Sequence, residues 1–93
     1  MEINWTELNS TVHAKRLDLF EHLCETLGED FFYYTQSKNQ KSILVYNEDK
    51  HIKMLVNTTH HSDGWDIKSI DITDQSENLE ETIFLVNPLY IKN

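Results

Sequence analysis

Apolar and polar residues alternate most clearly in the middle of the chain. Between His51 and Thr58, apolar residues occupy alternate positions, which is the period of two that a half-buried β-strand requires. Leu55 breaks this pattern, so the outer side of the strand is not fully polar. The stretch Lys41–Tyr46 is rich in strand formers, and the polar segment 47–50 can form the turn between the two. We therefore predict a central β-hairpin, which needs flanking elements because isolated hairpins are only marginally stable in water.

A helical period precedes this hairpin and predicts one helix from Trp5 to Leu27. Apolar residues recur at steps of three and four and share one helix face: Leu17, Phe20, Leu23, Cys24 and Leu27. Gly28 follows directly, where a helix cap with positive φ is favoured. The N-cap is either Asn4 or Ser10, the latter if 9–11 separates a short leading turn from the main helix. The core-facing side is expected to extend to Trp5, Leu8 and Val12.

Three more strands are predicted from runs of aromatic and β-branched residues: Phe31–Thr35, Trp65–Thr73 and Thr82–Val86. The first carries aromatic residues on both faces. The second changes the parity of its apolar residues near Lys68 and Ser69, and a β-bulge there would let all of them face the core.

The connections between these strands are polar. We expect a turn at 37–40, a loop at 59–64, and an acidic connection at 74–81 with one helical turn around 76–80. The segment 89–91 is expected to dock back on the fold. One helix followed by five strands with short links predicts an α+β domain, in which an N-terminal helix packs on a roughly five-stranded antiparallel meander.

Length and composition agree with a single domain over residues 1–93. The chain has 39% hydrophobic residues, one Pro and two Gly, which favours a folded core over disorder. It contains no apolar run of the length that a membrane helix needs, and its start lacks the pattern of a signal peptide. A single cysteine, Cys24, forms no internal disulfide and suits a reducing compartment. We expect a cytoplasmic protein.

The net charge of −8 argues against direct binding of nucleic acid and is compatible with a basic protein partner. The charge is also segregated along the chain. Residues 1–30 carry seven acidic and two basic residues. Residues 31–59 carry two acidic and four basic residues, and residues 60–86 carry seven acidic residues and one basic residue. The lysines of the middle region are Lys38, Lys41, Lys50 and Lys53.

Four acidic residues follow the helical period at steps of three, four and four: Asp18, Glu21, Glu25 and Glu29. At about 100° per residue they share one narrow side of the predicted helix, away from its apolar face. This row fits the solvated face of an amphipathic helix. It also fits a row of carboxylates that stands in for a DNA phosphate strand, because like charges at this spacing repel and a purely structural helix would gain from interleaved lysines.

A second group of acidic residues could supply another row: Asp63, Asp66, Asp71, Asp74, Glu77, Glu80 and Glu81. In its size and in these two acidic groups, the whole chain resembles phage-encoded inhibitors, namely DNA-mimic anti-restriction proteins such as Arn of the T-even phages and anti-CRISPR proteins. The resemblance implies a non-enzymatic protein, often a dimer, that occupies the nucleic-acid site of a nuclease in the cytoplasm of a bacterial host. The lysines depart from an all-acidic surface and would lie away from the mimic face or help a second subunit to dock.

Residues with other chemistry are few. His60 and His61 are adjacent in a predicted loop and diverge, so they are expected to be polar loop residues and not metal ligands. His13 is expected at the edge of the core, His22 on the surface, and Cys24 as a small buried apolar residue. No glycine-rich phosphate loop exists. We expect no catalysis, no cofactor and no metal.

The aromatic strand 31–35 also resembles a platform for stacking bases, but the negative charge opposes that function. Its two faces more plausibly serve the core and a dimer contact, and an uncovered sheet edge is another route to a homodimer. Three other functions remain open. One is an immunity or antitoxin protein that neutralises a basic toxin, and another is a small acidic secretion chaperone that binds an effector through apolar grooves. The third and least favoured is a small-ligand-binding or enzymatic domain, which would need a concave pocket lined by the sheet.

Overall fold

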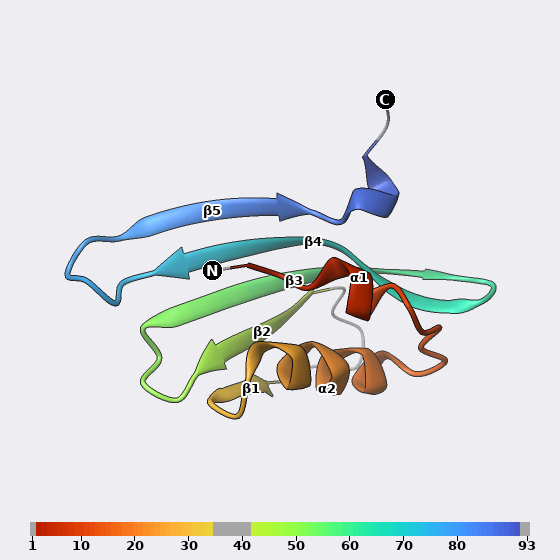
Figure 1. The fold of residues 1–93 in the computed structure, drawn as a ribbon, viewed down its shortest axis with the longest axis horizontal. Coiled ribbons are helices and arrows are strands. Elements are labelled where there is room, and N and C mark those ends of the chain that lie inside the picture. Colours follow the sequence, from red (N-terminus) through yellow and green to blue (C-terminus); the bar gives the residue numbers. More distant parts are fainter. Residues whose placement is uncertain (1, 35–41, 92–93) are drawn as a thin grey trace.

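The computed structural model describes residues 2–34 and 42–91. Its elements follow one another in the order helix, helix, five strands and a final 3-10 turn (Figure 1). Their bounds are α1 Trp5–Leu8, α2 Arg16–Leu27, β1 Phe31–Tyr34, β2 Ser42–Asn47, β3 Ile52–His61, β4 Gly64–Asp74, β5 Glu81–Val86 and η1 Pro88–Tyr90. The predicted turn at 37–40, with Thr35, Lys38 and Lys41, lies outside the described residues.

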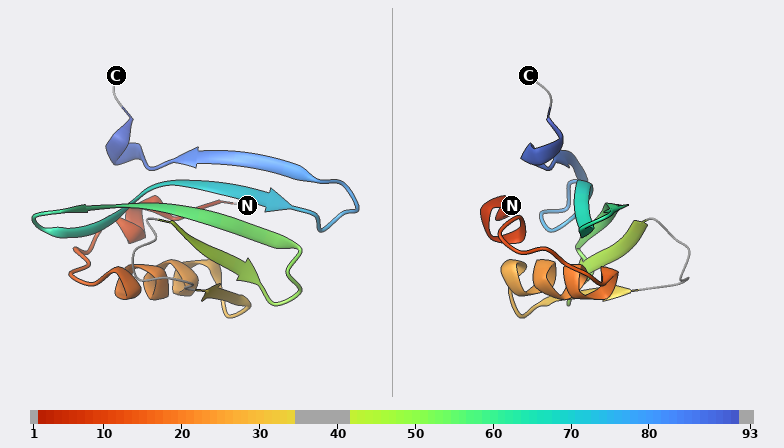
Figure 2. Two further views of the ribbon diagram at one scale, coloured as in Figure 1. Left: turned by 180° about the vertical axis from the view of Figure 1, so that it is seen from behind. Right: turned by 90° about the vertical axis from the view of Figure 1, so that its right-hand side faces the viewer.

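The five strands form one antiparallel sheet in the order β1-β2-β3-β4-β5, and both α-helices lie on one side of it (Figure 2). The predicted α+β class and the meander topology are therefore confirmed. Neighbouring strands pair in chain order because each connection is short enough to reverse the chain directly. We call the side that carries the helices the inner face and the opposite side the outer face.

The predicted β-bulge is confirmed in β4. Asn57 pairs with Ser69 and Thr58 pairs with Ile67, so Lys68 is the extra residue that the partner strand does not match. Without this insertion, Ile67 and Ile70 would point to opposite faces, because side chains alternate along a strand. With it, both are almost fully buried.

The core lies between the inner face and the helices. Its buried residues come from α1, α2 and strands β2, β3 and β4: Leu8, Leu19, Phe20, Leu23, Ile43, Val45, Met54, Val56, Ile67, Ile70 and Ile72. The alternation predicted for β3 is thus confirmed, with Leu55 on the outer face and 45% exposed. In β1, Phe31 and Tyr33 pack against the core, whereas Phe32 and Tyr34 are exposed on the outer face.

A continuous helix from Trp5 to Leu27 is wrong, and the alternative in which a short leading turn is separated from the main helix is confirmed, although the break extends from Asn9 to Lys15. Asn4 does cap α1 through its side chain, but α2 starts only after Lys15, and Ser10 caps neither helix. Between the helices, the carbonyl of His13 accepts a hydrogen bond from the Trp65 amide at 2.8 Å, which makes an isolated β-bridge. This segment covers the free edge of β4 beside the β3–β4 turn, a long-range contact that outweighs local helix propensity.

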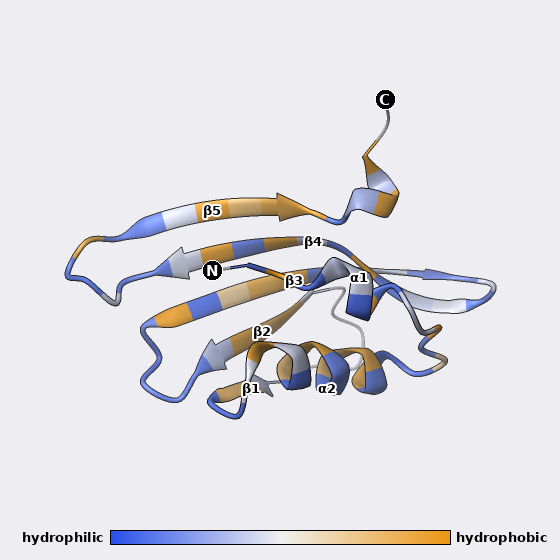
Figure 3. Cartoon of the chain, viewed as in Figure 1, coloured by the Kyte–Doolittle hydropathy of each residue, from blue (hydrophilic) through white to orange (hydrophobic). Residues whose placement is uncertain are grey.

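The predicted apolar face of the main helix was placed slightly off its true centre. Leu17 is 50% exposed and Val12 is 64% exposed, whereas Leu19, absent from that prediction, is buried. Cys24 and Leu27 pack at the edge of the core. The face is centred on Leu19, Phe20 and Leu23, and Figure 3 shows how α2 changes from hydrophobic to hydrophilic around its circumference.

Two predicted loops also differ from the structure. The segment 59–61 belongs to β3, where the His60 ring stacks on Trp65 with centroids 4.3 Å apart, and only Ser62 and Asp63 form the turn. No helical turn forms at 76–80, because the Asp74 carboxylate accepts hydrogen bonds from the Ser76 amide and hydroxyl and Asn78 adopts a φ of 62°. These interactions stabilise a turn instead.

Buried Asn87 holds the C-terminal segment on the fold. The predicted docking of 89–91 is confirmed only for Tyr90, whose hydroxyl donates to Asp66, because Leu89 and Ile91 are 62% and 56% exposed. The Asn87 side chain exchanges two hydrogen bonds with the Asn9 amide, at 2.9 and 3.0 Å, and donates to the Ile67 carbonyl at 2.8 Å. The same side chain accepts from the Leu89 amide and so caps η1.

Replacement of this residue, Asn87→Ala, is expected to lower the free energy of unfolding by about 2–4 kcal/mol, because it leaves buried polar groups without partners. Urea unfolding measures the change. Asn9→Ala is the matched comparison: it removes only the reciprocal pair and should cost about 1 kcal/mol. Equal losses in the two variants would contradict the central role given to Asn87.

Candidate functional site

Helix α2 positions an acidic row on its solvent side. Asp18, Glu21 and Glu25 are all exposed and, at about 100° per residue, fall within an arc of roughly 60° opposite the buried residues of the helix. Glu29 does not belong to the helix, because Gly28 ends it with a φ of 124°. We define Asp18, Glu21 and Glu25 as the helix acidic row, and Glu29 follows it beyond the cap.

The helix acidic row has little to neutralise it. Across residues 2–34 and 42–91, no Lys or Arg lies within 4.0 Å of a carboxylate, and the ion pairs found there both involve histidine. Within the described parts of the chain, Glu21 is the one member of this row with a hydrogen bond, which its carboxylate accepts from the Tyr33 hydroxyl at 3.4 Å. Burial raises the pKa of Tyr33, and the charge of Glu21 raises it further. Glu25 lies in the last turn, where the helix dipole disfavours negative charge.

An open groove of about 320 Å³ runs beside this row, between α2 and β1. It is lined by Glu21, Cys24, Glu25, Phe31, Phe32 and Tyr33. Burial raises the pKa of the Cys24 thiol to about 11, so it stays protonated and weakly nucleophilic near neutral pH. The groove lining therefore combines three aromatic side chains with two carboxylates, a surface suited to binding rather than to thiol chemistry.

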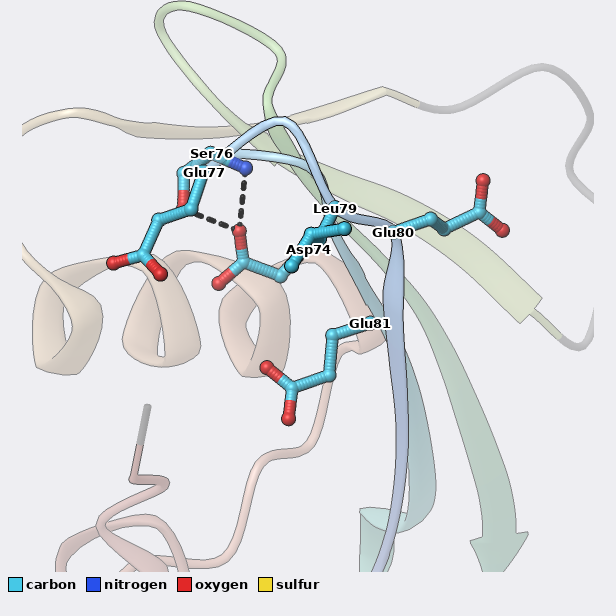
Figure 4. Close-up of a pocket in the computed structure, with 6 residues that line it drawn as sticks. All are labelled: Asp74, Ser76, Glu77, Leu79, Glu80 and Glu81. Atoms are coloured by element: carbon cyan, nitrogen blue, oxygen red, sulfur yellow. Dashed lines mark hydrogen bonds between the residues drawn. The ribbon is translucent and has the colours of Figure 1, made fainter.

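The β4–β5 connection forms a second acidic surface, shown in Figure 4. It contains Asp74, Ser76, Glu77, Leu79, Glu80 and Glu81. Hydrogen bonds from the Ser76 hydroxyl and amide lower the pKa of the Asp74 carboxyl. Glu80 points away from the other carboxylates and accepts a hydrogen bond from the Gln75 side chain at 3.1 Å. Part of this surface thus serves the turn itself.

The remaining acidic residues of the second group have structural partners or lie at other places. Asp66 accepts hydrogen bonds from His61 at 2.8 Å and from the Tyr90 hydroxyl at 3.0 Å. Asp71 lies on the outer face and accepts from the Asn57 amide at 3.2 Å. Asp63 is exposed in the turn between β3 and β4. Neither Asp66 nor Asp71 is a free carboxylate.

The two acidic groups do not form one continuous surface. The helix acidic row lies beside β1, at one edge of the sheet, whereas the β4–β5 connection lies at the other edge, four strand spacings or about 19 Å away (Figure 1). Asp63 and Asp74 lie at opposite ends of β4, which spans roughly 33 Å over its ten residue steps. Among the predicted site residues, the structure groups those on α2 at one edge of the sheet and Asp74, Glu77, Glu80 and Glu81 at the other.

The sequence analysis did not predict a contact between His13, which is buried, and His22, which is partly buried and not on the surface as expected. His13 Nε2 lies 2.8 Å from His22 Nδ1, and His22 Nε2 lies 3.3 Å from a Glu7 carboxylate oxygen. His13 is 6% exposed and its Nδ1 has no hydrogen-bond partner. Burial lowers the pKa of His13, and the neighbouring His22 lowers it further, while Asp18 and Asp66 act in the opposite direction. Only its β-bridge, which no local pattern signals, brings His13 to His22.

Acidification is expected to destabilise the protein through this pair. Because the pKa of His13 is lower in the folded chain than its ordinary value of 6.5, the unfolded chain takes up the proton first. The contribution of neutral His13 is therefore complete above pH 6.5 and is lost as pH falls below it. Urea unfolding at pH values on both sides should give a smaller loss in His13→Gln than in the wild type. The exposed His51→Gln variant is the control, and an unchanged loss in His13→Gln would contradict this assignment.

Comparisons of the chain with protein-family models, with curated protein sequences and with solved structures found no match. Within the described residues, no helix is long and apolar enough to cross a membrane. The same residues contain no group of three or more His, Cys, Asp or Glu side chains that could hold a metal ion.

Proposed function

We propose that this protein is a non-catalytic inhibitor that places the helix acidic row in the nucleic-acid-binding site of a basic protein, such as a host defence nuclease. The observation that carries the proposal is the state of this row: three exposed carboxylates on one helix face, none with a Lys or Arg partner among the described residues.

The energetics of α2 support a binding role for these carboxylates. The row contains two like-charge pairs, Asp18 with Glu21 and Glu21 with Glu25, and the charges of each pair repel by about 0.2–0.5 kcal/mol. The dipole adds a further penalty at Glu25. A helix with a purely structural role would be more stable with a lysine at one of these positions. A basic partner would turn the same repulsion into favourable charge-assisted contacts.

The spacing of the row suits the proposed competition. With a rise of about 1.5 Å per residue, the carboxylates recur at about 4.5 and 6 Å along the axis, and the charges of a DNA strand recur about every 3.4 Å. The row thus has roughly two-thirds of the linear charge density of one DNA strand. Lys and Arg side chains that hold phosphates could therefore hold these carboxylates. Such a complex should weaken with salt.

Affinity capture from bacterial lysate tests the proposal. The tagged protein is expected to retain a nucleic-acid-binding protein at low salt and to release it at high salt or when competitor DNA is added. The purified target should then lose DNA binding in proportion to the inhibitor added. A partner whose binding is insensitive to both salt and DNA would contradict the mimic and favour the immunity or chaperone alternatives.

A further inference from the structure

The outer face of the sheet carries an apolar surface that no described element covers. Figure 2 shows the α-helices on the opposite side. Five of its side chains are between 36% and 60% exposed: Phe32, Tyr34, Leu44, Leu55 and Phe84. Strand register places four of them in one row, since Tyr34 pairs with Leu44, Leu44 with Leu55, and Asp71 lies between Leu55 and Phe84. The fifth, Phe32, lies two residues before Tyr34 on the same face of β1. We call these five residues the outer apolar row.

We propose that a second copy of this chain covers the outer apolar row, in a homodimer whose sheets pack face to face. This inference does not depend on the proposed inhibitor function, because its test measures association of the protein with itself. The helix acidic row lies on the other side of each sheet and would stay exposed on both outer surfaces of such a dimer.

Charge favours a second copy over an acidic or basic partner. The protein as a whole has a net charge of −8, which opposes self-association over most of its surface. Among the described residues, the charged side chains around the outer apolar row are Lys53, Asp71 and Lys50, whose Nζ lies 5.7 Å from the ring of Tyr46 beside Phe32. The region of the sheet that exposes apolar side chains thus lacks the acidic excess of the protein as a whole, and two copies meet there with less repulsion than elsewhere.

The arrangement of Lys53 and Asp71 matches itself under two-fold symmetry. Lys53 lies two residues from Leu55 along β3, roughly 6.6 Å away, and Asp71 lies beside Leu55 on β4, roughly 4.8 Å away. Consider a two-fold axis that lies in the plane of the interface and passes through Leu55. It bisects the angle between the direction from Leu55 to Lys53 and the direction from Leu55 to Asp71. Rotation about this axis brings Lys53 of each copy to Asp71 of the other. The sheets would then cross near 90°, which is one of the preferred angles for stacked sheets.

A second sheet on the outer face would complete the burial of this sheet. Both α-helices lie on the inner face (Figure 2), and a sheet in a compact domain usually buries its apolar face against another layer.

Sedimentation over a dilution series tests the proposal. The wild type is expected to sediment as a dimer, at twice 11.0 kDa, and to dissociate on dilution. Leu55→Lys should raise the dissociation constant by about a hundredfold or more, because it buries a charge at the two-fold axis. The position is already 45% exposed, so the monomer should still fold. Leu17→Lys, at a half-exposed leucine on α2, is the matched control and should leave the dimer intact.

A charge exchange tests the symmetry independently. Lys53→Glu should weaken the dimer by roughly tenfold or more, since it sets two carboxylates against each other, and the exchanged pair Lys53→Glu with Asp71→Lys should restore most of the lost affinity. Failure of the exchange to restore the dimer would overturn this pairing.

Three results would overturn the face-to-face dimer. The first is a wild type that is monomeric at every concentration. The second is a dimer that Leu55→Lys leaves unchanged while hydrogen exchange shows new protection of β5 amides, which would indicate pairing through the sheet edge instead. The third is a monomer in which Leu55→Lys abolishes binding of a captured target, which would assign the outer apolar row to that target.

Discussion

The double variant Glu21→Lys, Glu25→Lys is expected to lose binding to a nucleic-acid-binding target by at least a hundredfold. Each reversal removes a contact with a basic side chain and replaces it with a repulsion, and such changes at close charge pairs typically cost 2 kcal/mol or more each. Both carboxylates line the groove between α2 and β1, so they would act on the same part of a target. Titration calorimetry with the captured protein measures the loss.

The same variant should be slightly more stable than the wild type. It converts the like-charge pair Asp18–Glu21 into an opposite-charge pair, leaves positions 21 and 25 with like charges, and places a lysine in the last turn, which together favour the helix by about 0.5–1 kcal/mol. Weaker binding together with a more stable fold would distinguish a binding surface from a structural one, because loss of a structural contact lowers both.

The control for this variant carries the same change of net charge elsewhere. Glu77→Lys, Glu80→Lys alters the β4–β5 connection, which lies at the other edge of the sheet from the helix acidic row. We expect a much smaller loss of affinity there. If both double variants lose binding equally, total charge and not the helix acidic row drives the interaction, and the proposed site is wrong.

Replacement of Gly64 by alanine is expected to lower the free energy of unfolding by about 3–5 kcal/mol, a large part of the stability of a domain this small. Gly64 has a φ of 142°, which side chains rarely adopt, and a Cβ there would lie 2.5 Å from the His13 carbonyl oxygen. That oxygen accepts the hydrogen bond from the Trp65 amide, so it cannot move without breaking the β-bridge. Thermal and urea unfolding measure the effect.

Gly28 provides the comparison that separates backbone strain from steric conflict. Its φ is 124°, but a Cβ there would meet nothing within 4 Å. Gly28→Ala should therefore show the strain alone, about 1–3 kcal/mol. If Gly64→Ala costs no more than Gly28→Ala, the close packing of the His13 segment on β4 does not contribute to stability as described.

In Gly64→Ala, the loss of stability on acidification that is assigned to His13 should also be smaller, because the β-bridge holds the histidine in place.

The strands and the bulge could be predicted because their signals are local. Alternation in β3 and the change of parity in β4 follow directly from the period of two, and the bulge at Lys68 is the one insertion that lets both apolar pairs face the core. The cap at Gly28 follows from the absence of a side chain at a position that requires positive φ.

The errors arose where a distant contact decides the local conformation. The 9–15 segment has residues compatible with a helix, yet it is extended at His13 because the edge of β4 offers it a hydrogen bond. His60 and His61 look like loop residues, yet they extend β3 because β4 continues opposite them. The centre of the α2 face depends on which side the sheet covers, and so Leu19 and not Leu17 is buried.

The candidate site likewise has one part that could be predicted from the sequence and one part that could not. The row Asp18, Glu21, Glu25 could be recognised from the sequence because helix geometry alone relates residues three and four positions apart. That the second acidic group lies at the far edge of the sheet, and that two of its members are engaged by His61, Tyr90 and Asn57, could not.

The sequence by itself therefore determined the class of fold, the strands, the bulge and the acidic side of α2, since periodicity and residue size act over a few residues. Only the tertiary structure decided which acidic residues share a surface, where His13 meets His22, and which apolar side chains remain uncovered on the outer face. Those outcomes depend on contacts between segments far apart in the chain, and the free energy of such contacts exceeds the local preferences that a sequence pattern reports.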